Sequence, residues 1–310
     1  MLKYKQIHYT EILKKFPGFE DEIDLDEYLS DGRQDILENI DLFAPNCRTS
    51  YLENDFDKFK KVEKIDKDTV ILIGFYLELF IYNNKTNYMF DLIDYYCNLY
   101  KDNIIVCSYN HDIDFKFFND FTKQYKNLKI INFNTSEKTS NDIVVPFFAI
   151  NQESYKEEYK YNYGFVGNCT HPVRDDIIEK FENNKFFFTS NNIPIKEFYK
   201  TISGFVYNLC PRGCGLSSYR FYESIFCNTI PVLFTEKICL PYEEFLDYDT
   251  FSVYIKCGNF IDYPQVLDIL NSKDREKMRN NLSLNKKYFT LKYIQDYVAK
   301  NIKDTGNINT

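Results

Sequence analysis

A loop rich in arginine and glycine is the first feature of the sequence that could bind a charged ligand. The run Pro-Arg-Gly-Cys-Gly-Leu-Ser occupies positions 211–217, after an apolar segment that ends at Cys210. Glycine lets a backbone approach a ligand closely or take positive φ. We expect a helix to begin near Ser218, and a helix N-terminus offers free N–H groups and about half a positive charge to an anion. Arg212 and Arg220 flank this terminus, and an arginine can bind a phosphate through two hydrogen bonds.

A carboxylate lies one turn into the same expected helix. Arg220, Glu223 and Cys227 are spaced i, i+3 and i+7, which places them on one helical face. Beside two arginines, the Glu223 carboxylate could accept hydrogen bonds from a ribose or sugar diol, so this region suits a nucleoside diphosphate. The alternative is a structural turn in which Arg220 and Glu223 form a surface ion pair worth a few tenths of a kcal/mol. The loop is neither a Walker A sequence nor a GxGxxG motif.

The overall composition is that of a soluble globular protein. The 310 residues carry 38 Lys and Arg against 46 Asp and Glu, a net charge of −8. This balance argues against non-specific binding to nucleic acid or to an anionic membrane, which needs a basic surface. Hydrophobic residues make up 44% and charged residues 27%, which excludes a disordered or fibrous chain. At about 150 residues per domain, the length predicts two domains.

Cysteine usage and the N-terminal segment favour a cytoplasmic protein with reduced thiols. The nine cysteines are odd in number and irregularly spaced, which makes a poor disulfide framework. Cys210 and Cys214 lack the further ligands of a zinc site, which needs about four. The N-terminal segment has no apolar core of a signal peptide. The longest apolar run, residues 69–82, contains Glu78 and is too short to cross a bilayer, so we expect no transmembrane segment. We expect contact with a membrane only through an acceptor substrate.

Alternating apolar strands and amphipathic helices predict an α/β fold. Residues 1–66 show short helical patterns and no clear motif. Strands are expected at residues 70–76, 103–109, 128–133, 142–146, 163–166, 185–189, 205–210, 230–234 and 250–255. Helices are expected at residues 88–100, 115–125, 175–183, 195–203, 218–227, 240–245, 263–271 and 286–301. Because continuously apolar strands alternate with helices, each half should be Rossmann-like, with a parallel sheet covered on both faces.

The expected domain boundaries follow from this pattern. The first domain covers residues 1–155 and the second covers residues 160–285, with the polar, tyrosine-rich segment 151–163 connecting them. Residues 286–310 contain a last helix and a tail, and this helix either presents a solvated face or crosses back to the first domain. Doubly wound sheets bind ligands at the carboxyl ends of their strands. We therefore expect the arginine loop to lie at such an edge.

Residues 205–255 resemble the exostosin family of glycosyltransferases. The matching motifs are, in order, Leu209-Cys210-Pro211-Arg212-Gly213, Gly215, Ser218, Arg220, Glu223-Ser224, Ile230-Pro231-Val232, Leu240-Pro241-Tyr242 and Phe251-Ser252-Val253. Weaker matches are Phe165-Val166-Gly167 with His171 and Arg174, and the segment 142–146. Asn228 stands where the family usually has Gly, and Ser224 stands where it usually has Ala.

The resemblance implies a GT-B architecture, in which two Rossmann-like domains face a cleft and the C-terminal domain holds a nucleotide sugar. The donor would be a UDP- or GDP-sugar, the acceptor a glycan or glycolipid hydroxyl, and the transfer would invert the anomeric carbon. The donor-binding residues that the resemblance and the loop indicate are Asn168, Arg174, Arg212, Gly213, Gly215, Ser217, Ser218, Tyr219, Arg220 and Glu223. The three arginines would contact phosphates, and Glu223 the ribose or sugar. No divalent metal is expected as a cofactor, because arginines and a helix terminus supply the positive charge.

Inverting transfer also needs a general base on the acceptor hydroxyl. His111 and Asp112 are the candidates, because they follow the expected strand 103–109; a loop-capping Asp and a solvated His are the alternative. Asp112 and Asp114 also form a DxD pattern that could hold Mg²⁺ or Mn²⁺ in a metal-dependent, GT-A-like transferase, although similar patterns recur in this acidic chain. A non-catalytic homologue that binds a nucleotide or glycan is a third hypothesis.

Overall fold

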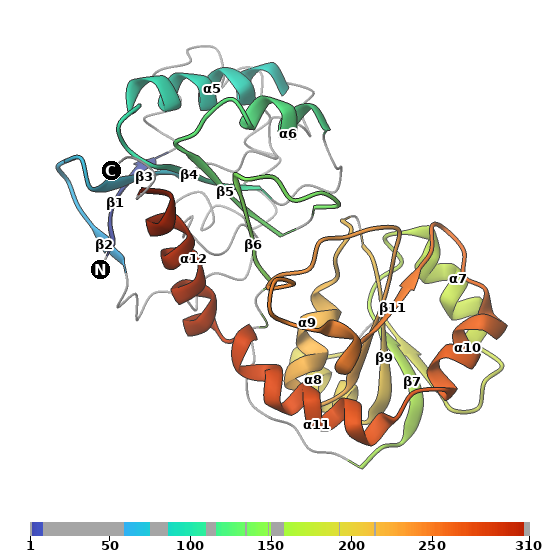
Figure 1. Cartoon of the computed structure of the whole chain (residues 1–310). Helices are drawn as coiled ribbons and strands as arrows, with labels where there is room; N and C mark the ends of the chain where they lie inside the picture. Colours follow the sequence, from blue (N-terminus) through green and yellow to red (C-terminus); the bar gives the residue numbers. More distant parts are fainter. Residues whose placement is uncertain are drawn as a thin grey trace. The chain divides into compact units, whose positions relative to one another are not determined.

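The chain divides into two compact units in the computed structural model (Figure 1). The structure describes residues 2–8, 59–74, 86–109, 116–133, 135–147, 149, 158–191, 193–213 and 215–306. Unit 1 comprises Met1–Phe133, Lys138–Val144 and Ile294–Thr310. Unit 2 comprises Asn134–Glu137 and Val145–Tyr293. Unit 1 is therefore built from both ends of the chain.

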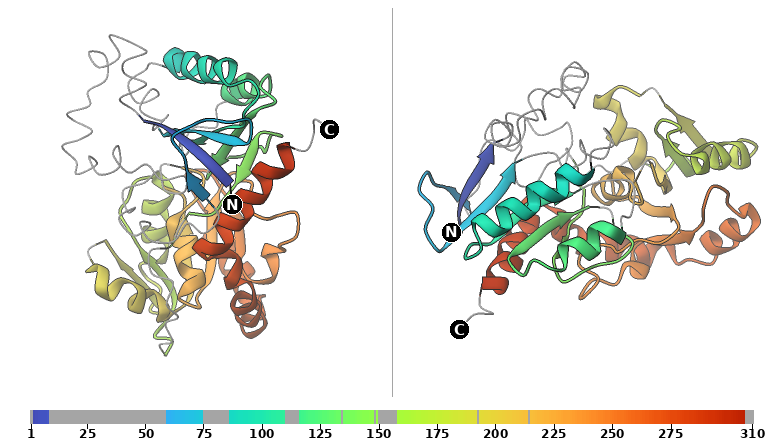
Figure 2. Two further views of the ribbon diagram at one scale, coloured as in Figure 1. Left: turned by 90° about the vertical axis from the view of Figure 1, so that its left-hand side faces the viewer. Right: turned by 90° about the horizontal axis from the view of Figure 1, so that it is seen from above.

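Unit 1 contains a six-stranded sheet in the order β2-β1-β3-β4-β5-β6, and its neighbouring strands are parallel. The strands are β1 (Leu2–His8), β2 (Phe59–Lys61), β3 (Thr69–Gly74), β4 (Ile105–Tyr109), β5 (Leu128–Asn132) and β6 (Asp142–Val144). Helices α5 (Thr86–Leu99) and α6 (Lys116–Thr122) cover one face of this sheet (Figures 1 and 2). The part of α12 (Leu291–Gly306) that belongs to unit 1 covers the other face.

Strand β1 lies inside this sheet, between β2 and β3, whereas we expected no strand before residue 70. Leu2 and Ile7 are buried as a sheet interior requires. Lys3 instead keeps its ammonium group half-exposed, where it pairs with Asp66 at 2.8 Å. Lysines within such a short segment hide its apolar positions from a pattern search, which explains why the strand was missed.

Unit 2 contains a five-stranded parallel sheet in the order β11-β10-β9-β7-β8. Its strands are β7 (Tyr161–Val166), β8 (Phe187–Ser190), β9 (Phe205–Pro211), β10 (Ile230–Thr235) and β11 (Val253–Lys256). Its helices are α7 (Pro172–Phe181), α8 (Ile195–Ser203), α9 (Tyr219–Phe226), α10 (Tyr263–Asn271) and α11 (Arg275–Asn285). Both units are thus α/β with parallel, doubly wound sheets, and the expected fold class is confirmed.

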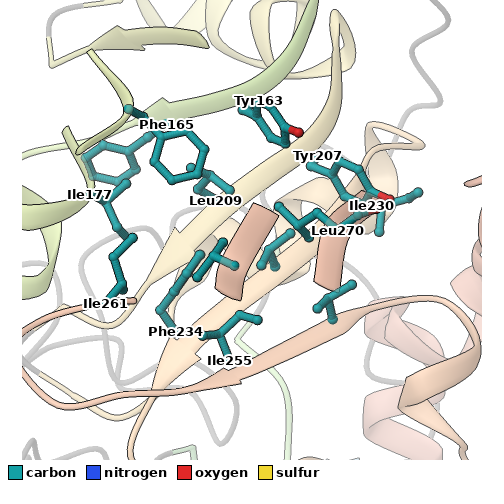
Figure 3. Packing of buried hydrophobic residues seen from close by; sticks show 14 of the residues in the cluster. Tyr163, Phe165, Ile177, Tyr207, Leu209, Ile230, Phe234, Ile255, Ile261 and Leu270 are labelled. Atoms are coloured by element: carbon teal, nitrogen blue, oxygen red, sulfur yellow. Dashed lines mark hydrogen bonds between the residues drawn. The ribbon is translucent and has the colours of Figure 1, made fainter. Parts of the chain in front are cut away.

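The larger core of unit 2 lies between the sheet and helices α7 and α10 (Figure 3). The strands contribute side chains at period two: Tyr163, Phe165, Tyr207, Leu209, Ile230, Val232, Phe234, Val253 and Ile255. Ile177 of α7 and Leu270 of α10 pack against them and are fully buried. On the other face, Phe198 and Ile202 of α8 pack on Phe205. Helices therefore pack on both faces of the sheet that carries the predicted site.

The C-terminal elements differ from the expected ones in three places. Helix α11 was not predicted, because it is strongly polar and buries only Met278 and Leu282. The helix expected at residues 240–245 is wrong; the segment forms turns around Tyr242, whose φ of 64° is incompatible with a right-handed helix. The helix expected at residues 286–301 is instead a 3₁₀ turn, η4 (Lys286–Phe289), followed by α12. In the described part of the chain, no helix combines the length and apolar character needed to span a bilayer.

Candidate functional site

The predicted donor residues of unit 2 gather at the carboxyl edge of its sheet. In the sheet, β8 lies on one side of β7, and β10 lies on the opposite side of β9. The connection after β7 and the connection after β9 therefore run in opposite directions across the sheet, and the direction changes between these two strands. Loops diverge at such a switch point and leave room for a ligand. The loop after β7 carries Asn168 and leads into α7, whose first turn contains Arg174. The loop after β9 carries Arg212 and Gly213 and leads into α9.

Arg174 ties these two loops together. Its Nε donates to the carbonyl of Arg212 at 3.0 Å, Nη1 donates to the carbonyl of Asn168 at 2.6 Å, and Nη2 donates to that of Pro211 at 3.3 Å. A Cβ on Gly213 would lie 3.0 Å from Arg174 Nη2, so glycine allows this close approach. The guanidinium thus shapes the backbone of the loop, and its expected contact with a phosphate stays a prediction.

Arg212 is held from the neighbouring strand by Glu236. Its Nη1 lies 2.5 Å from Glu236 Oε2, and its backbone N–H donates to the carbonyl of Phe234 at 3.0 Å. The Arg212 side chain is 11% exposed and that of Glu236 is 45% exposed. Sequence reasoning missed Glu236, although it follows directly on β10, which pairs with β9. The strand order, which places these two strand ends side by side, was the missing information.

His171 caps helix α7 next to Arg212. Its Nδ1 accepts a hydrogen bond from the backbone N–H of Val173 at 3.3 Å. Partial burial, and then the positive charge of Arg212, lower the pKa of His171 below its ordinary value of 6.5. A neutral imidazole is needed for this cap, since a protonated Nδ1 cannot accept a hydrogen bond.

Arg220 is fixed from three sides on the first turn of α9. Its Nε donates to the carbonyl of Val166 at 2.6 Å, Nη1 donates to Glu223 Oε2, and the guanidinium carbon lies 4.3 Å from the centre of the Phe198 ring. The Glu223 side chain is 1% exposed, which rules out the alternative of a surface ion pair. Among the described residues, none accepts a hydrogen bond from Nη2 of Arg220. A rigid, partly exposed guanidinium therefore lies at the strand edge.

The N-terminus of α9 adds to this positive charge. Ser218 is the N-cap residue, but its side chain makes no capping hydrogen bond, and the first turn contains no acidic residue. Ser217 and Ser218 are both buried, each 4% exposed. Within the described part of unit 2, the Ser218 hydroxyl has no hydrogen-bond partner. No carboxylate in the first turn of α9 therefore offsets the positive end of the helix dipole.

The neighbouring tyrosines have structural contacts. The ring of Tyr219 stacks on Phe147, with centroids 4.1 Å apart. Tyr222 is 1% exposed and packs against Phe147, Phe221 and Phe289. Tyr222 therefore belongs to the hydrophobic interior, whereas a ligand contact of Tyr219 stays a prediction.

The predicted catalytic residues lie outside the described part of the chain. His111 and Asp112 fall between residues 110 and 115, as does Asp114 of the alternative DxD pattern. Cys214, in the middle of the arginine loop, is likewise outside it. Across the described ranges, no three His, Cys, Asp or Glu side chains are grouped so as to hold a metal ion.

A doubly wound unit with arginines and a helix N-terminus at its switch point is typical of α/β domains that bind anions. The sequence model of the exostosin GT47 domain matches residues 102–272, more than half of the chain. The chain belongs to the exostosin GT47 family, as the motifs of residues 205–255 indicated.

Several known proteins are similar to this chain. A probable glycosyltransferase of Arabidopsis thaliana is 23% identical over 134 residues, which cover 41% of this chain and 27% of that protein. A probable glucuronosyltransferase of Oryza sativa subsp. japonica is 30% identical over 100 residues, 32% of this chain and 23% of that one. This chain spans about a quarter of the length of these curated relatives. Among solved structures, the GtfA/B complex aligns with a TM-score of 0.48 at 9% identity, over 78% of this chain and 58% of that chain.

Proposed function

We propose that this protein is a glycosyltransferase that moves a sugar from a nucleotide diphosphate to a hydroxyl of a glycan or glycolipid. The observation that carries the proposal is the Arg220 guanidinium, which Val166 and Glu223 hold at the carboxyl edge of unit 2. Membership of the exostosin GT47 family supports the reaction class. So do the names of relatives, which include a probable glucuronosyltransferase and a probable β-1,4-xylosyltransferase. The proposed donor is a UDP- or GDP-sugar.

In the proposed site, the diphosphate lies at the N-terminus of α9, between Arg212 and Arg220. Each arginine is already oriented by a carboxylate, Glu236 or Glu223, so little ordering is needed when the anion binds. Glu223 Oε2 accepts a hydrogen bond from Arg220 Nη1, and the proposed role of the carboxylate is to contact a ribose or sugar hydroxyl as well. The burial of Glu223 means that the ligand must enter deeply to reach it.

The proposed transfer is an in-line displacement. The acceptor oxygen forms a bond to the anomeric carbon while the bond from that carbon to the phosphate oxygen breaks, so the configuration inverts. Negative charge develops on the departing phosphate oxygen, and Arg220 with the helix terminus would stabilise it. The acceptor proton passes to a general base, for which His111 and Asp112 are the candidates. No divalent metal enters this proposal, because the arginines supply the positive charge.

The test is a thermal-shift screen against UDP, GDP, CMP and ADP, followed by a turnover assay. A ligand at about 100 times its dissociation constant stabilises a protein by about 2.7 kcal/mol, which is easily seen in the melting temperature. We expect UDP or GDP to give this shift and Arg220→Ala to abolish it, with turnover reduced about a hundredfold or more.

The matched control is Arg275→Ala. Arg275 is an arginine of the same unit, at the start of helix α11. Its guanidinium carbon lies 5.4 Å from the centre of the Tyr207 ring. This variant should keep the nucleotide shift and turnover. Normal nucleotide binding and turnover by the Arg220→Ala enzyme would contradict the proposed site.

A further inference from the structure

Unit 2 contains a cavity of about 520 Å³ that the predicted donor residues do not line. It lies on the α9 face of the sheet, over β10 and β11, and its apolar floor comes from Phe221 and Leu233. The turn segment between Ile238 and Asp249 forms its opposite wall. Small-molecule sites have volumes of about 300–1,000 Å³, so this cavity has room for one or two sugar rings.

Two aromatic side chains on the cavity wall are unusually exposed. Phe245 is 48% exposed and Tyr254 is 41% exposed, although both line the cavity. The Tyr254 hydroxyl donates to the carbonyl of Glu236 at 2.6 Å and that of Thr235 at 3.3 Å, which fixes the ring on the edge strand β11. Phe245 is supported from behind by Tyr242, whose ring is stacked on it with centroids 5.7 Å apart. Both rings are thus rigid, apolar surfaces open to solvent.

The charged side chains around this cavity are acidic. Glu243, Asp247 and Asp249 line it and are exposed, and no lysine or arginine is found among the described residues that line it. One oxygen of Glu243 accepts from the backbone N–H of Leu240 at 2.8 Å, and one oxygen of Asp247 accepts from that of Asp249 at 3.2 Å. The Asp249 carboxylate has no hydrogen-bond partner within the described part of the chain. The cavity therefore offers hydrogen-bond acceptors and repels anions.

We propose that this cavity binds an uncharged saccharide unit. A pyranose has an apolar C–H face that can pack on an aromatic ring, and its hydroxyl groups donate hydrogen bonds that carboxylates accept. An acidic sugar or a phosphate would meet three carboxylates without a compensating cation. Glu236 pairs with Arg212 through its carboxylate, and its backbone carbonyl accepts a hydrogen bond from the Tyr254 hydroxyl. The same residue therefore links the proposed phosphate site with this cavity. The role of the cavity in the cell rests on the proposed sugar transfer. The binding of a saccharide to the cavity does not depend on that proposal.

Tryptophan fluorescence gives a direct test, because the chain contains no Trp. The variant Tyr254→Trp places a single reporter in the cavity, and Phe260→Trp, at a site 72% exposed and not lining it, is the matched control. The probes are the methyl glycosides of glucose, galactose and N-acetylglucosamine, with glucuronic acid as the anionic probe. We expect at least one neutral glycoside to give a saturable change in Tyr254→Trp emission and none in the control. Glucuronic acid should bind roughly tenfold more weakly.

A charge-removal variant tests the reason for this preference. Asp249→Asn, combined with Tyr254→Trp, removes one negative charge from the cavity wall. The Asp249 carboxylate accepts no hydrogen bond in the described structure, so its loss should not disturb the fold. The preference for neutral over anionic sugar should therefore shrink severalfold. The inference is overturned if no neutral glycoside changes the emission, or if glucuronic acid binds as tightly as the neutral sugars. Thermal shifts with UDP and GDP on the same Tyr254→Trp protein keep the two proposals apart. A thermal shift with UDP or GDP but no saccharide binding would contradict this inference alone. Saccharide binding without any thermal shift with a nucleotide would contradict the proposed function alone.

Discussion

Asn228 shows how one residue can replace a glycine of the family pattern. It follows the last turn of α9 with a φ of 55°, in the left-handed region that favours Gly and tolerates Asn. We expect Asn228→Gly to leave the melting temperature within a degree or two. Asn228→Val should lower it by several degrees, because a β-branched residue in this conformation costs about 1–3 kcal/mol. Equal melting temperatures of the two variants would contradict this account.

His171 gives a pH-dependent contribution to stability. Because its pKa is lowered in the folded protein, the unfolded chain binds more protons in the window between the folded pKa and 6.5. Stability should therefore rise with pH through this window and fall on acidification. His171→Asn keeps an N-cap side chain without this titration. Melting temperatures at about pH 7.5 and about pH 5.5 should differ less for the variant than for the parent protein; an equal or larger difference would refute the assignment.

At the scale of elements, strand β7 depends on a glycine that faces an aromatic ring. A Cβ added to Gly164 would lie 2.2 Å from the ring of Phe205 on the neighbouring strand β9, so Gly164→Ala must displace a fully buried side chain. We expect this change to cost about 1–3 kcal/mol in the free energy of unfolding. Gly258→Ala is the control, because a Cβ there meets nothing within 4 Å. Denaturant unfolding of both variants measures the difference, and comparable losses would show that the Phe205 contact is not the cause.

At the scale of the whole molecule, the proposed chemistry should not need a divalent metal. In the proposed site, Arg212, Arg220 and the N-terminus of α9 would supply the positive charge that a metal supplies in other transferases. We expect turnover and the nucleotide-induced thermal shift to be unchanged after treatment with EDTA. Loss of either, with recovery on adding Mg²⁺ or Mn²⁺, would favour the alternative in which Asp112 and Asp114 hold a metal.

Much of the fold could be predicted because buried parallel strands are continuously apolar. Helices α8 and α10 have the expected bounds, and β9 and β10 differ by one residue at their ends. The elements that were missed are those whose charge hides the pattern: β1 with its lysines and the polar helix α11. Their positions are decided by tertiary packing, which a local pattern does not contain.

The candidate site could be predicted as a set of residues but not as a set of contacts. The arginine loop and the helix that follows lie at the strand edge as expected. The sequence could not show that Arg174 binds three backbone carbonyls or that Arg212 pairs with Glu236, because both depend on which strands are neighbours. Spacing along the helix did suggest the pairing of Arg220 with Glu223, but not its burial.

The composition of unit 1 from both ends of the chain has a consequence for synthesis. Unit 2 is complete once Tyr293 has left the ribosome, whereas unit 1 still lacks the part of α12 from Ile294 onward, in which Val298 and Ile302 are fully buried. Domains that emerge first generally fold first. Here the order is reversed for the finished structure: the C-terminal unit can close before α12 packs on the N-terminal sheet. A chain cut directly after Tyr293 would therefore contain all of unit 2 but lack the part of α12 that packs on the sheet of unit 1.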